Sequence, residues 1–364
     1  MNGKIRVAVV GGAFSEIHIQ GFKCCPEFEV VSICRRQKHL AEQTARKYNI
    51  ERYDTDFDEM ITSSDIDVVS LAVPHHLHYP MTLKAFDLGK HVICEKPLGL
   101  NVREVVEMIR KAEEKQLIHQ TVFNWRFVPV FFHMKELIDE GEVGSVYHIS
   151  FNWLGSGRRD RESPFTWRFS QAEAGYGALG DTGVHGIDLI HWMAGDFKRV
   201  ISHMSIFVPE HKGETGKYRK TEVEDSCSFL GELVGGGQVI FHVSSVASCR
   251  SVIRLEIHGD KGTLGAQLFP RDGDLNGKLY GGKGATDLRK EVLLPERLTS
   301  APILLPEGYS PRALFFARFA ERLAKPIRSR QKFSPDFHDG LRAQKVLQAL
   351  TDSCQQQRWQ SLAY

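Results

Sequence analysis

Asp181 and His185 have the residue types and the spacing that a proton-transfer site requires. If the expected helix 179–193 forms, residues four positions apart share one face, and the carboxylate lies beside the imidazole. Such a carboxylate fixes the tautomer of the ring and raises its basicity, which a general base near pH 7 needs. A satisfied structural histidine is the alternative. A metal site is disfavoured, because no His-Glu-x-x-His motif is present and His191 falls on a different face.

Lys96 is a second candidate, in a Glu-Lys-Pro turn that follows the short apolar strand 92–94. Pro97 disfavours the helical region for Lys96 and gives the turn a fixed shape. Asn101, with Glu104 three residues later, is typical of a capping pair that opens a helix. The lysine therefore lies at the carboxyl end of a strand, where ligands bind in open α/β sheets. A solvated turn lysine is the alternative.

A glycine turn at Gly11 and Gly12 follows the expected strand 4–10 and precedes a helical segment. Such a turn can direct backbone N–H groups and a helix N-terminus at a pyrophosphate. It departs from the G-x-G-x-x-G fingerprint, because Ala13 stands at the second glycine and no third glycine is present. An ordinary tight turn is the alternative.

Arg35 and Arg36 follow the next expected strand, 29–34. An acidic residue at this place would bind the ribose 2′-hydroxyl of NAD, whereas arginines suit a 2′-phosphate, which they can pair bidentately. The pair therefore favours NADP if the fold is a Rossmann fold. Two surface arginines are the alternative.

Two further groups of polar residues are candidates. His75, His76 and His78 follow an expected strand, and we expect a loop whose histidines have separate roles rather than a zinc site, because no cysteine or carboxylate is nearby. Pro80 is expected to open the next helix at its first turn. The polar loop 155–177 is either the lining of a substrate pocket or a mobile basic loop. Its candidate residues are Arg158, Arg159, Trp167 and Arg168.

The order of strands and helices predicts the fold class. Strands alternate with helices up to residue 122, which is typical of a doubly wound parallel sheet. Beyond residue 123, strands linked by turns predict a mostly antiparallel sheet, with a hairpin at 235–237. We therefore expect a nucleotide-binding domain at 1–122 and a substrate and oligomerisation domain at 123–364, whose last helix can pack back on the first domain.

Composition narrows the class of protein. The 364 residues are 42% hydrophobic and 25% charged, as in an ordinary soluble globular protein. A formal net charge of +2 argues against a dedicated nucleic-acid surface, and no apolar stretch approaches the roughly 18 residues of a membrane span. Seven cysteines without a Cys-x-x-Cys, and a strand that begins almost at once, predict a cytoplasmic protein with reduced thiols.

Together these segments resemble the glucose–fructose oxidoreductase and inositol dehydrogenase family (Gfo/Idh/MocA) over nearly the whole chain. The order and spacing of several blocks carry the resemblance. These blocks are Ala72-Val73-Pro74 with His78, Gly89-Lys90-His91-Val92, Glu95-Lys96-Pro97, Trp167-Arg168 with Gly175 and Gly177, the run from Asp181 through Gly183 and His185 to Asp188, and Asp339-Gly340-Leu341-Arg342 to Ser353.

The resemblance implies a fold and a reaction. The fold is an N-terminal Rossmann domain with a doubly wound parallel sheet, followed by a C-terminal α/β domain with a large, mostly antiparallel open sheet. Members often pair through that sheet, so a homodimer or homotetramer is expected. The reaction is reversible hydride transfer between NAD(P) and a sugar, polyol, inositol or similar alcohol, and Arg35 favours NADP. No metal, nucleic acid or membrane partner is expected.

The resemblance also implies residue roles in both domains, so the active site is expected between them. His185 accepts the hydroxyl proton, Asp181 orients His185, and Lys96 stabilises charge on the substrate oxygen. The Lys96–Pro97 bond is expected to be cis. The implied cofactor-binding residues are Gly11, Gly12, Ala13, Phe14, Arg35, Arg36, Pro74, His78, Glu95 and Lys96. The implied substrate-binding residues are Arg126, Trp153, Trp167, Arg168, Asp181 and His185.

Two other functions are open. A dinucleotide-binding regulator or sensor without turnover has the incomplete glycine turn as its support, although neither Lys96 nor His185 is lost. An NAD-dependent glycosidase would use the same fold. Release of sugar from a nitrophenyl glycoside, dependent on bound NAD, would identify it.

Overall fold

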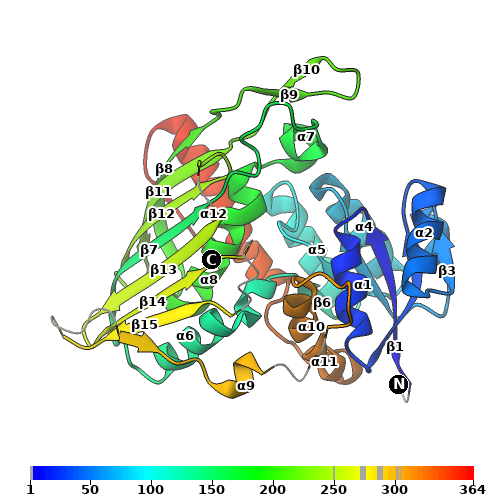
Figure 1. Ribbon diagram of the computed structural model, residues 1–364, viewed down its shortest axis with the longest axis horizontal. Helices are drawn as coiled ribbons and strands as arrows, with labels where there is room; N and C mark the ends of the chain where they lie inside the picture. Colours follow the sequence, from blue (N-terminus) through cyan, green and yellow to red (C-terminus); the bar gives the residue numbers. More distant parts are fainter. Residues whose placement is uncertain (1–2, 249–250, 271–275, 285–289, 301–302, 304) are drawn as a thin grey trace. The chain divides into compact units, whose positions relative to one another are not determined.

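The computed structural model describes residues 3–248, 251–270, 276–284, 290–300, 303 and 305–364. Its contacts divide the chain into two compact units (Figure 1). Unit 1 comprises Met1–Asn124 and Pro302–Leu341, and unit 2 comprises Trp125–Ala301 and Arg342–Tyr364. The first unit thus includes a segment near the C-terminus, which the sequence assigns to the second domain. The expected domains themselves stay a prediction.

Unit 1 contains a six-stranded sheet. Its strands are β1 (Ile5–Gly11), β2 (Phe28–Cys34), β3 (Arg52–Asp54), β4 (Val68–Ala72), β5 (His91–Cys94) and β6 (His119–Thr121). They run parallel in the order β3-β2-β1-β4-β5-β6. This order confirms the predicted doubly wound sheet of the Rossmann type. β4 and β5 are buried along their whole length, because helices cover both faces.

The helices of unit 1 are α1 (Ser15–Lys23), α2 (Lys38–Tyr48), α3 (Phe57–Met60), α4 (His75–Asp87), α5 (Val102–Glu114), α10 (Ala313–Glu321) and α11 (Ala324–Ser329). The predicted capping pair is confirmed at the start of α5. Asn101 accepts the N–H of Glu104 at 3.0 Å, and the Glu104 carboxylate accepts the N–H of Leu100 at 2.8 Å. The first bond satisfies an N–H group that has no partner within the helix.

Helix α4 begins at His75, and Pro80 lies inside it. The expected loop at 75–78 and the expected helix start at Pro80 are therefore both wrong. Pro74 stands at the N-cap with φ −55° and ψ 146°, so the chain turns into the helix there. Because proline suits the first turn of a helix, Pro80 resembled a start, whereas in the interior it removes one backbone hydrogen bond.

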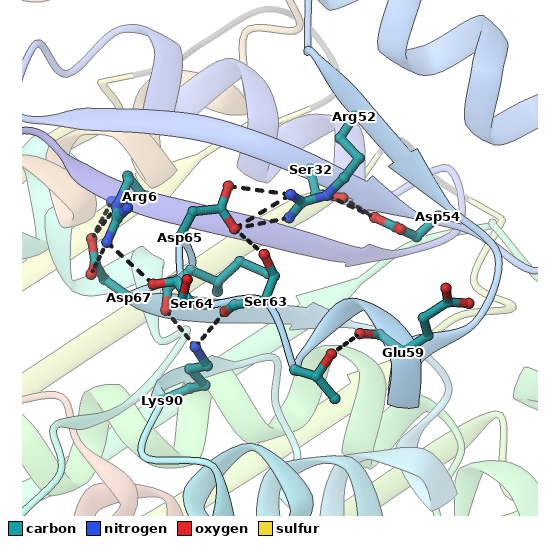
Figure 2. Close-up of polar contacts among 12 residues, drawn as sticks. Arg6, Ser32, Arg52, Asp54, Glu59, Ser63, Ser64, Asp65, Asp67 and Lys90 are labelled. Atoms are coloured by element: carbon teal, nitrogen blue, oxygen red, sulfur yellow. Dashed lines mark hydrogen bonds and ion pairs between the residues drawn. The ribbon is translucent and has the colours of Figure 1, made fainter.

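Polar side chains tie the amino ends of β4 and β5 to neighbouring loops (Figure 2). Lys90 donates from Nζ to the carbonyl oxygens of Ser63 at 2.7 Å and Ile66 at 2.9 Å. Arg6 pairs with Asp67 at 3.1 Å. Burial lowers the pKa of Lys90. These side chains stabilise the amino edge of the sheet. Ligands of such folds bind at the opposite, carboxyl edge, so these contacts are not part of the candidate site.

Helix α10 packs beside α1 within unit 1 (Figure 1). The ring of Phe316 stacks on His18 with centroids 4.2 Å apart and meets Phe22 edge-on at 5.0 Å. Both His18 and Phe22 are fully buried. The late segment is grouped with unit 1 because it supplies this part of the core.

Unit 2 contains a nine-stranded sheet. Its strands are β7 (Val146–Leu154), β8 (Phe197–Ser205), β11 (Ser226–Leu233), β12 (Gln238–Ser244), β13 (Val252–Gly259), β14 (Thr263–Leu268), β15 (Lys278–Gly282), β16 (Lys290–Val292) and β17 (Gln360–Ser361). Their order is β16-β15-β14-β13-β7-β12-β11-β8-β17. Every described pair is antiparallel except β7 with β12, which confirms the predicted sheet.

One helix packs closely on this sheet, at Gly186. The remaining elements are η1 (Asn124–Phe127), α6 (Pro129–Asp139), η2 (Trp167–Phe169), α7 (Gln171–Ala174), the π-helix η3 (Leu179–Gly183), α8 (Val184–Ala194), β9 (Glu210–Lys212), β10 (Tyr218–Lys220), α9 (Glu296–Thr299) and α12 (Phe337–Gln356). A Cβ on Gly186 would lie 2.4 Å from Phe151 and 2.8 Å from Phe241, so glycine alone permits this approach of α8.

Among the described residues, no helix combines the length and apolar character needed to cross a membrane.

Candidate active site

The glycine turn after β1 brings two pieces of backbone into close approach. Gly11 has φ +147°, and a Cβ on it would lie 2.1 Å from the carbonyl oxygen of Ala72. No side chain fits there. A Cβ on Gly12 would have no atom within 4 Å, and Ala13 and Phe14 complete the turn before α1. The turn therefore combines a side-chain-free approach with a helix N-terminus, and both features suit a pyrophosphate despite the incomplete fingerprint.

Arg35 and Arg36 follow β2 in different surroundings. Arg35 donates to the hydroxyl of Thr44 at 2.5 Å and lies 3.9 Å from a carboxylate oxygen of Glu16, and only 11% of its side chain is exposed. Arg36 is exposed. The neighbours of Arg35 already engage its guanidinium group, so Arg36 is the arginine that faces solvent.

Glu95 fixes the backbone of the Glu-Lys-Pro turn. Its N–H donates to the carbonyl oxygen of Leu71 at 2.9 Å. One carboxylate oxygen accepts the N–H of Lys96 at 3.2 Å, and the other lies 3.1 Å from Nε2 of His18. The bond between Lys96 and Pro97 is cis, as expected. Lys96 therefore follows β5 on a backbone that a neighbouring carboxylate holds.

His78 braces the same turn from α4. Its Nδ1 lies 2.8 Å from the carbonyl oxygen of Pro97, and its Nε2 lies 3.1 Å from that of Val73. Burial lowers the pKa of His78 to about 4, so the ring is neutral near pH 7 and donates through one nitrogen. The side chain thus contacts the chain's own backbone. Within the described ranges, no group of side chains is arranged to hold a metal ion.

His185, at the start of α8, lies against two tryptophans of unit 2. Its ring centroid is 5.8 Å from that of Trp125 and 6.0 Å from that of Trp153, with the second pair stacked at 26°. The two indoles are 4.8 Å apart. Only 5% of His185 is exposed. Trp153, expected to bind substrate, supports the ring of the candidate base, and Trp125 does so without having been predicted.

Asp181 lies in the π-helix η3 rather than in the same α-helix as His185. The expected helix 179–193 is present, but its first turn is a π-helix rather than part of the α-helix. Arg158 donates from Nη2 to Asp181 at 3.0 Å, and Nε of Arg168 lies 3.9 Å from the same carboxylate. The Arg168 guanidinium also lies 4.4 Å from the centroid of the Trp167 ring. The polar loop 155–177 thus places two arginines near the carboxylate, and its role in substrate binding stays a prediction.

Glu224 anchors the start of η3 and was not foreseen from the sequence. One of its carboxylate oxygens accepts the N–H groups of Gly177 at 2.8 Å and Leu179 at 2.9 Å. A Cβ on Gly177 would lie 1.7 Å from the carbonyl oxygen of Glu224, so the two segments touch through backbone. Burial raises the pKa of Glu224. The irregular turn that carries Asp181 is therefore held by a residue 45 positions beyond Leu179, where the turn begins.

Arg126, expected to bind substrate, is instead buried in a pair with Asp188. Its Nε donates to Asp188 at 2.8 Å, and the two side chains are 3% and 2% exposed. Its guanidinium group also lies 5.6 Å from the centroid of the Trp192 ring. This placement supports a role in holding α8, which carries His185. A direct substrate contact by Arg126 has no support from its surroundings.

Two family models match the chain. The model described as the oxidoreductase family with an NAD-binding Rossmann fold matches residues 5–123, and the model of the GFO/IDH/MocA C-terminal domain matches residues 131–265. The chain belongs to the GFO/IDH/MocA family. As a member, it is an NAD(P)-dependent oxidoreductase, and the glycine turn lies in its NAD-binding part.

Several curated GFO/IDH/MocA relatives act on sugar-like alcohols. Levoglucosan dehydrogenase of Pseudarthrobacter phenanthrenivorans is 29% identical over 74% of this chain and 75% of its own length. D-glucoside 3-dehydrogenase of Escherichia coli is 28% identical over 76% of this chain and 80% of its own length. Inositol 2-dehydrogenase of Rhizobium meliloti is 23% identical over 99% of both chains.

Solved structures agree with both units of this GFO/IDH/MocA fold. Levoglucosan dehydrogenase in complex with NADH superposes with a TM-score of 0.89 at 26% identity and covers 99% of each chain. The complex of that enzyme with NADH and levoglucosan has a TM-score of 0.88 at 26% identity, and covers 99% of this chain and 100% of its own.

The expected residues of this GFO/IDH/MocA chain group differently in the two units. In unit 1, His78 and Glu95 meet at the Lys96 turn, and Pro74 opens the helix that carries His78. In unit 2, an aromatic group surrounds His185, two arginines lie near Asp181, and Glu224 anchors the start of the π-helix that carries Asp181. The catalytic and binding roles of these residues stay predictions.

Proposed function

We propose that this GFO/IDH/MocA oxidoreductase transfers a hydride reversibly between a nicotinamide cofactor and a secondary hydroxyl group of a sugar or related polyol. The observation that carries the proposal is Lys96 on a turn that Glu95 and His78 brace at the carboxyl end of β5. A lysine held in this way is arranged to act on a bound ligand. The names of the levoglucosan and D-glucoside dehydrogenases support the substrate class.

The protein residues have distinct tasks in this proposal. Gly11 and the N–H groups at the start of α1 hold the dinucleotide, which supplies the hydride chemistry when bound. His185 accepts the hydroxyl proton at a ring nitrogen. Lys96 donates from Nζ to the substrate oxygen and stabilises its negative charge. Asp181, with Arg158 on its carboxylate, orients the substrate beside His185.

The aromatic and charged surroundings of unit 2 suit a sugar. The indoles of Trp125 and Trp153 offer apolar surface next to His185. Asp181 and Arg168 are 33% and 39% exposed, so both can exchange hydrogen bonds with hydroxyl groups. A ligand pocket with a few placed polar groups among apolar ones fixes the orientation of such a substrate.

NADP is the cofactor that we favour within this proposal. Arg36 is exposed directly after β2, where a 2′-phosphate would be recognised. Arg35 is engaged by Thr44, so we assign the phosphate contact to Arg36. The NADH complexes of levoglucosan dehydrogenase support NAD instead. Thermal-shift titrations decide between them, since a bound cofactor stabilises by mass action. Much stronger stabilisation by NADH than by NADPH would overturn the assignment.

A substrate panel tests the reaction itself. Purified protein is incubated with sugars, inositols and dihydrodiols, each with either cofactor, and absorbance of the reduced nicotinamide is followed. We expect turnover with at least one sugar or polyol. Dinucleotide binding without turnover on the whole panel would instead support a regulator or sensor. NAD-dependent release of nitrophenol from a nitrophenyl glycoside would support a glycosidase.

We also propose a homodimer or homotetramer that assembles through the open face of the nine-stranded sheet. Leu230 of β11 and Ile240 of β12 are neighbours in register and are 49% and 61% exposed. Adjacent exposed apolar side chains favour association. Light scattering on the purified protein should give a mass of two or four chains, and Leu230→Glu with Ile240→Glu should give a monomer. A monomeric unmodified protein would refute this assembly.

A cytoplasmic location is proposed from the cysteines, because the six within the described residues are free thiols. Fractionation of expressing cells tests it. Recovery of the protein mainly outside the cytoplasmic fraction would contradict the proposal.

A further inference from the structure

His18 is a buried polar residue with no task in the reaction proposed above. It lies on α1, one turn beyond the glycine turn, and none of its surface is exposed. Its Nδ1 lies 2.8 Å from the hydroxyl of Ser70 in β4, and its Nε2 lies 3.1 Å from Glu95. One imidazole thus joins the helix after the glycine turn, a central strand and the lysine turn.

Both ring nitrogens of His18 have a hydrogen-bond partner. An ionised carboxylate only accepts, so Nε2 carries the hydrogen and donates to Glu95. The Ser70 hydroxyl can donate or accept, so it complements Nδ1 in whichever role that nitrogen takes. The second oxygen of Glu95 accepts the N–H of Lys96 at 3.2 Å. A continuous series of bonds therefore runs from Ser70 through His18 and Glu95 to the backbone of Lys96.

Packing alone does not account for a histidine at this position. The ring stacks on Phe316 at 4.2 Å, and an apolar aromatic residue would fill the same space. A buried polar side chain is tolerated when its hydrogen bonds are satisfied, and it then specifies one arrangement of its partners. The partner that His18 specifies is the carboxylate beside Lys96.

We propose that His18 is a positioning residue for Lys96: it orients the Glu95 carboxylate, which in turn fixes the backbone that carries the lysine. The inference deepens the proposed function, because it rests on Lys96 as the group that acts on the substrate oxygen. It also gives α1 two roles, since the helix that begins at the glycine turn holds the catalytic turn as well.

Two amide substitutions separate the contacts of His18. In His18→Gln the side-chain amide reaches the place of Nε2 and keeps a donor to Glu95. In His18→Asn the amide reaches only the place of Nδ1, so it keeps the contact with Ser70 and loses the one with Glu95. Both variants bury an amide of similar polarity, so a general cost of substitution affects both.

The first readout is turnover with the substrate found in the panel. We expect His18→Asn to lower kcat at least ten-fold with little change in KM, and His18→Gln to stay within about three-fold of the unmodified enzyme. A shifted pH profile of kcat in His18→Asn alone would add support. Equal kcat values in the two folded variants would overturn the inference.

The second readout does not depend on turnover. Acetic anhydride labels lysines at rates that mass spectrometry resolves, and the rate at Lys96 is taken relative to Lys332, whose side chain is 77% exposed. We expect the relative rate to change several-fold in His18→Asn and to be kept in His18→Gln. An unchanged rate in His18→Asn would overturn the inference whether or not a substrate is known. Absence of turnover in the unmodified protein, with this labelling difference present, would instead refute the proposed function.

Discussion

Arg126 and Asp188 form a two-point ion pair inside unit 2, in which Nε and Nη2 each donate to a different carboxylate oxygen. Neither side chain is more than 3% exposed. Removing one partner leaves the other charge buried and unpaired, so we expect Arg126→Met to destabilise the protein by about 3–5 kcal/mol. Urea unfolding measures this loss.

The double variant Arg126→Met with Asp188→Leu is the control for that pair. Replacing both charges with apolar residues removes the unpaired carboxylate, so much of the lost stability should return. A single variant Arg126→Met as stable as the unmodified protein would show that the pair does not hold α8.

Gly11 and Gly12 offer a matched test of the glycine turn after β1. A Cβ at Gly11 would meet the Ala72 carbonyl oxygen at 2.1 Å, so we expect Gly11→Ala to cost about 1–3 kcal/mol of stability through overpacking. A Cβ at Gly12 meets nothing within 4 Å, and Gly12→Ala should stay within about 0.5 kcal/mol. Thermal unfolding compares them. Equal losses in the two variants would contradict the close approach.

Lys96→Met tests the assignment of the lysine. The substitution keeps the length of the side chain and removes its charge and donors, so we expect kcat to fall about 10²–10³-fold. Stabilisation by the dinucleotide should persist. Lys84→Met, at a side chain that is 53% exposed on α4, serves as the control and should keep full activity. Retained turnover in Lys96→Met would remove the lysine from the mechanism.

Arg158 and Arg159 are adjacent but differ in surroundings. Arg158 is buried and donates to Asp181, whereas Arg159 is exposed. Loss of a hydrogen bond to a charged group costs about 1.5–3 kcal/mol, so kcat/KM should fall roughly 10- to 100-fold in Arg158→Ala. Arg159→Ala should be nearly unchanged. Steady-state kinetics on the same substrate compares the two, and equal effects would refute a specific role for Arg158.

His91 makes stability depend on pH. Its Nδ1 accepts the N–H of Ile118 at 3.0 Å, and burial lowers the pKa of His91 from 6.5 to about 4. The unfolded chain therefore takes up a proton below about pH 6.5 while the folded state does not, so stability falls as the pH drops from 6.5 toward 4. The expected slope for this one residue is about 1.4 kcal/mol per pH unit.

The variant His91→Asn isolates that slope. Its side-chain oxygen can accept the same N–H and does not titrate. Urea unfolding at pH 7 and pH 5 should show a loss smaller by about 2 kcal/mol in the variant than in the unmodified protein. Parallel losses would show that His91 is charged in both states or in neither.

The parallel sheet could be predicted because its strands have a clear sequence signal. The segments that became β4 and β5 are short apolar runs buried on both faces, and such runs have few other structures open to them. Helix α4 was placed wrongly because proline has the same local preference at 74 and at 80, and only the packed structure decides which one begins the helix.

The sequence suggests residues for the candidate site, whose roles stay predictions, but it does not report their contacts. His18 meets Ser70 and Glu95, which are 52 and 77 positions away, and no local pattern reports such pairings. The same holds for Glu224, which lies 45 positions beyond Leu179 and accepts its N–H at the start of the π-helix. Spacing rules assume a regular element, and this site is built where the elements are irregular.

Strand β7 is the middle strand of its sheet and the first of that sheet to leave the ribosome. Its two neighbours, β12 and β13, begin only at Gln238 and Val252. Both edges of β7 therefore stay unpaired during synthesis until these strands have been made. Pairing of strands that are distant in sequence is slow, and unpaired strand edges promote aggregation. Trp153 lies on this strand, so the surface against which His185 rests forms late, and a nascent chain released before residue 238 would lack it.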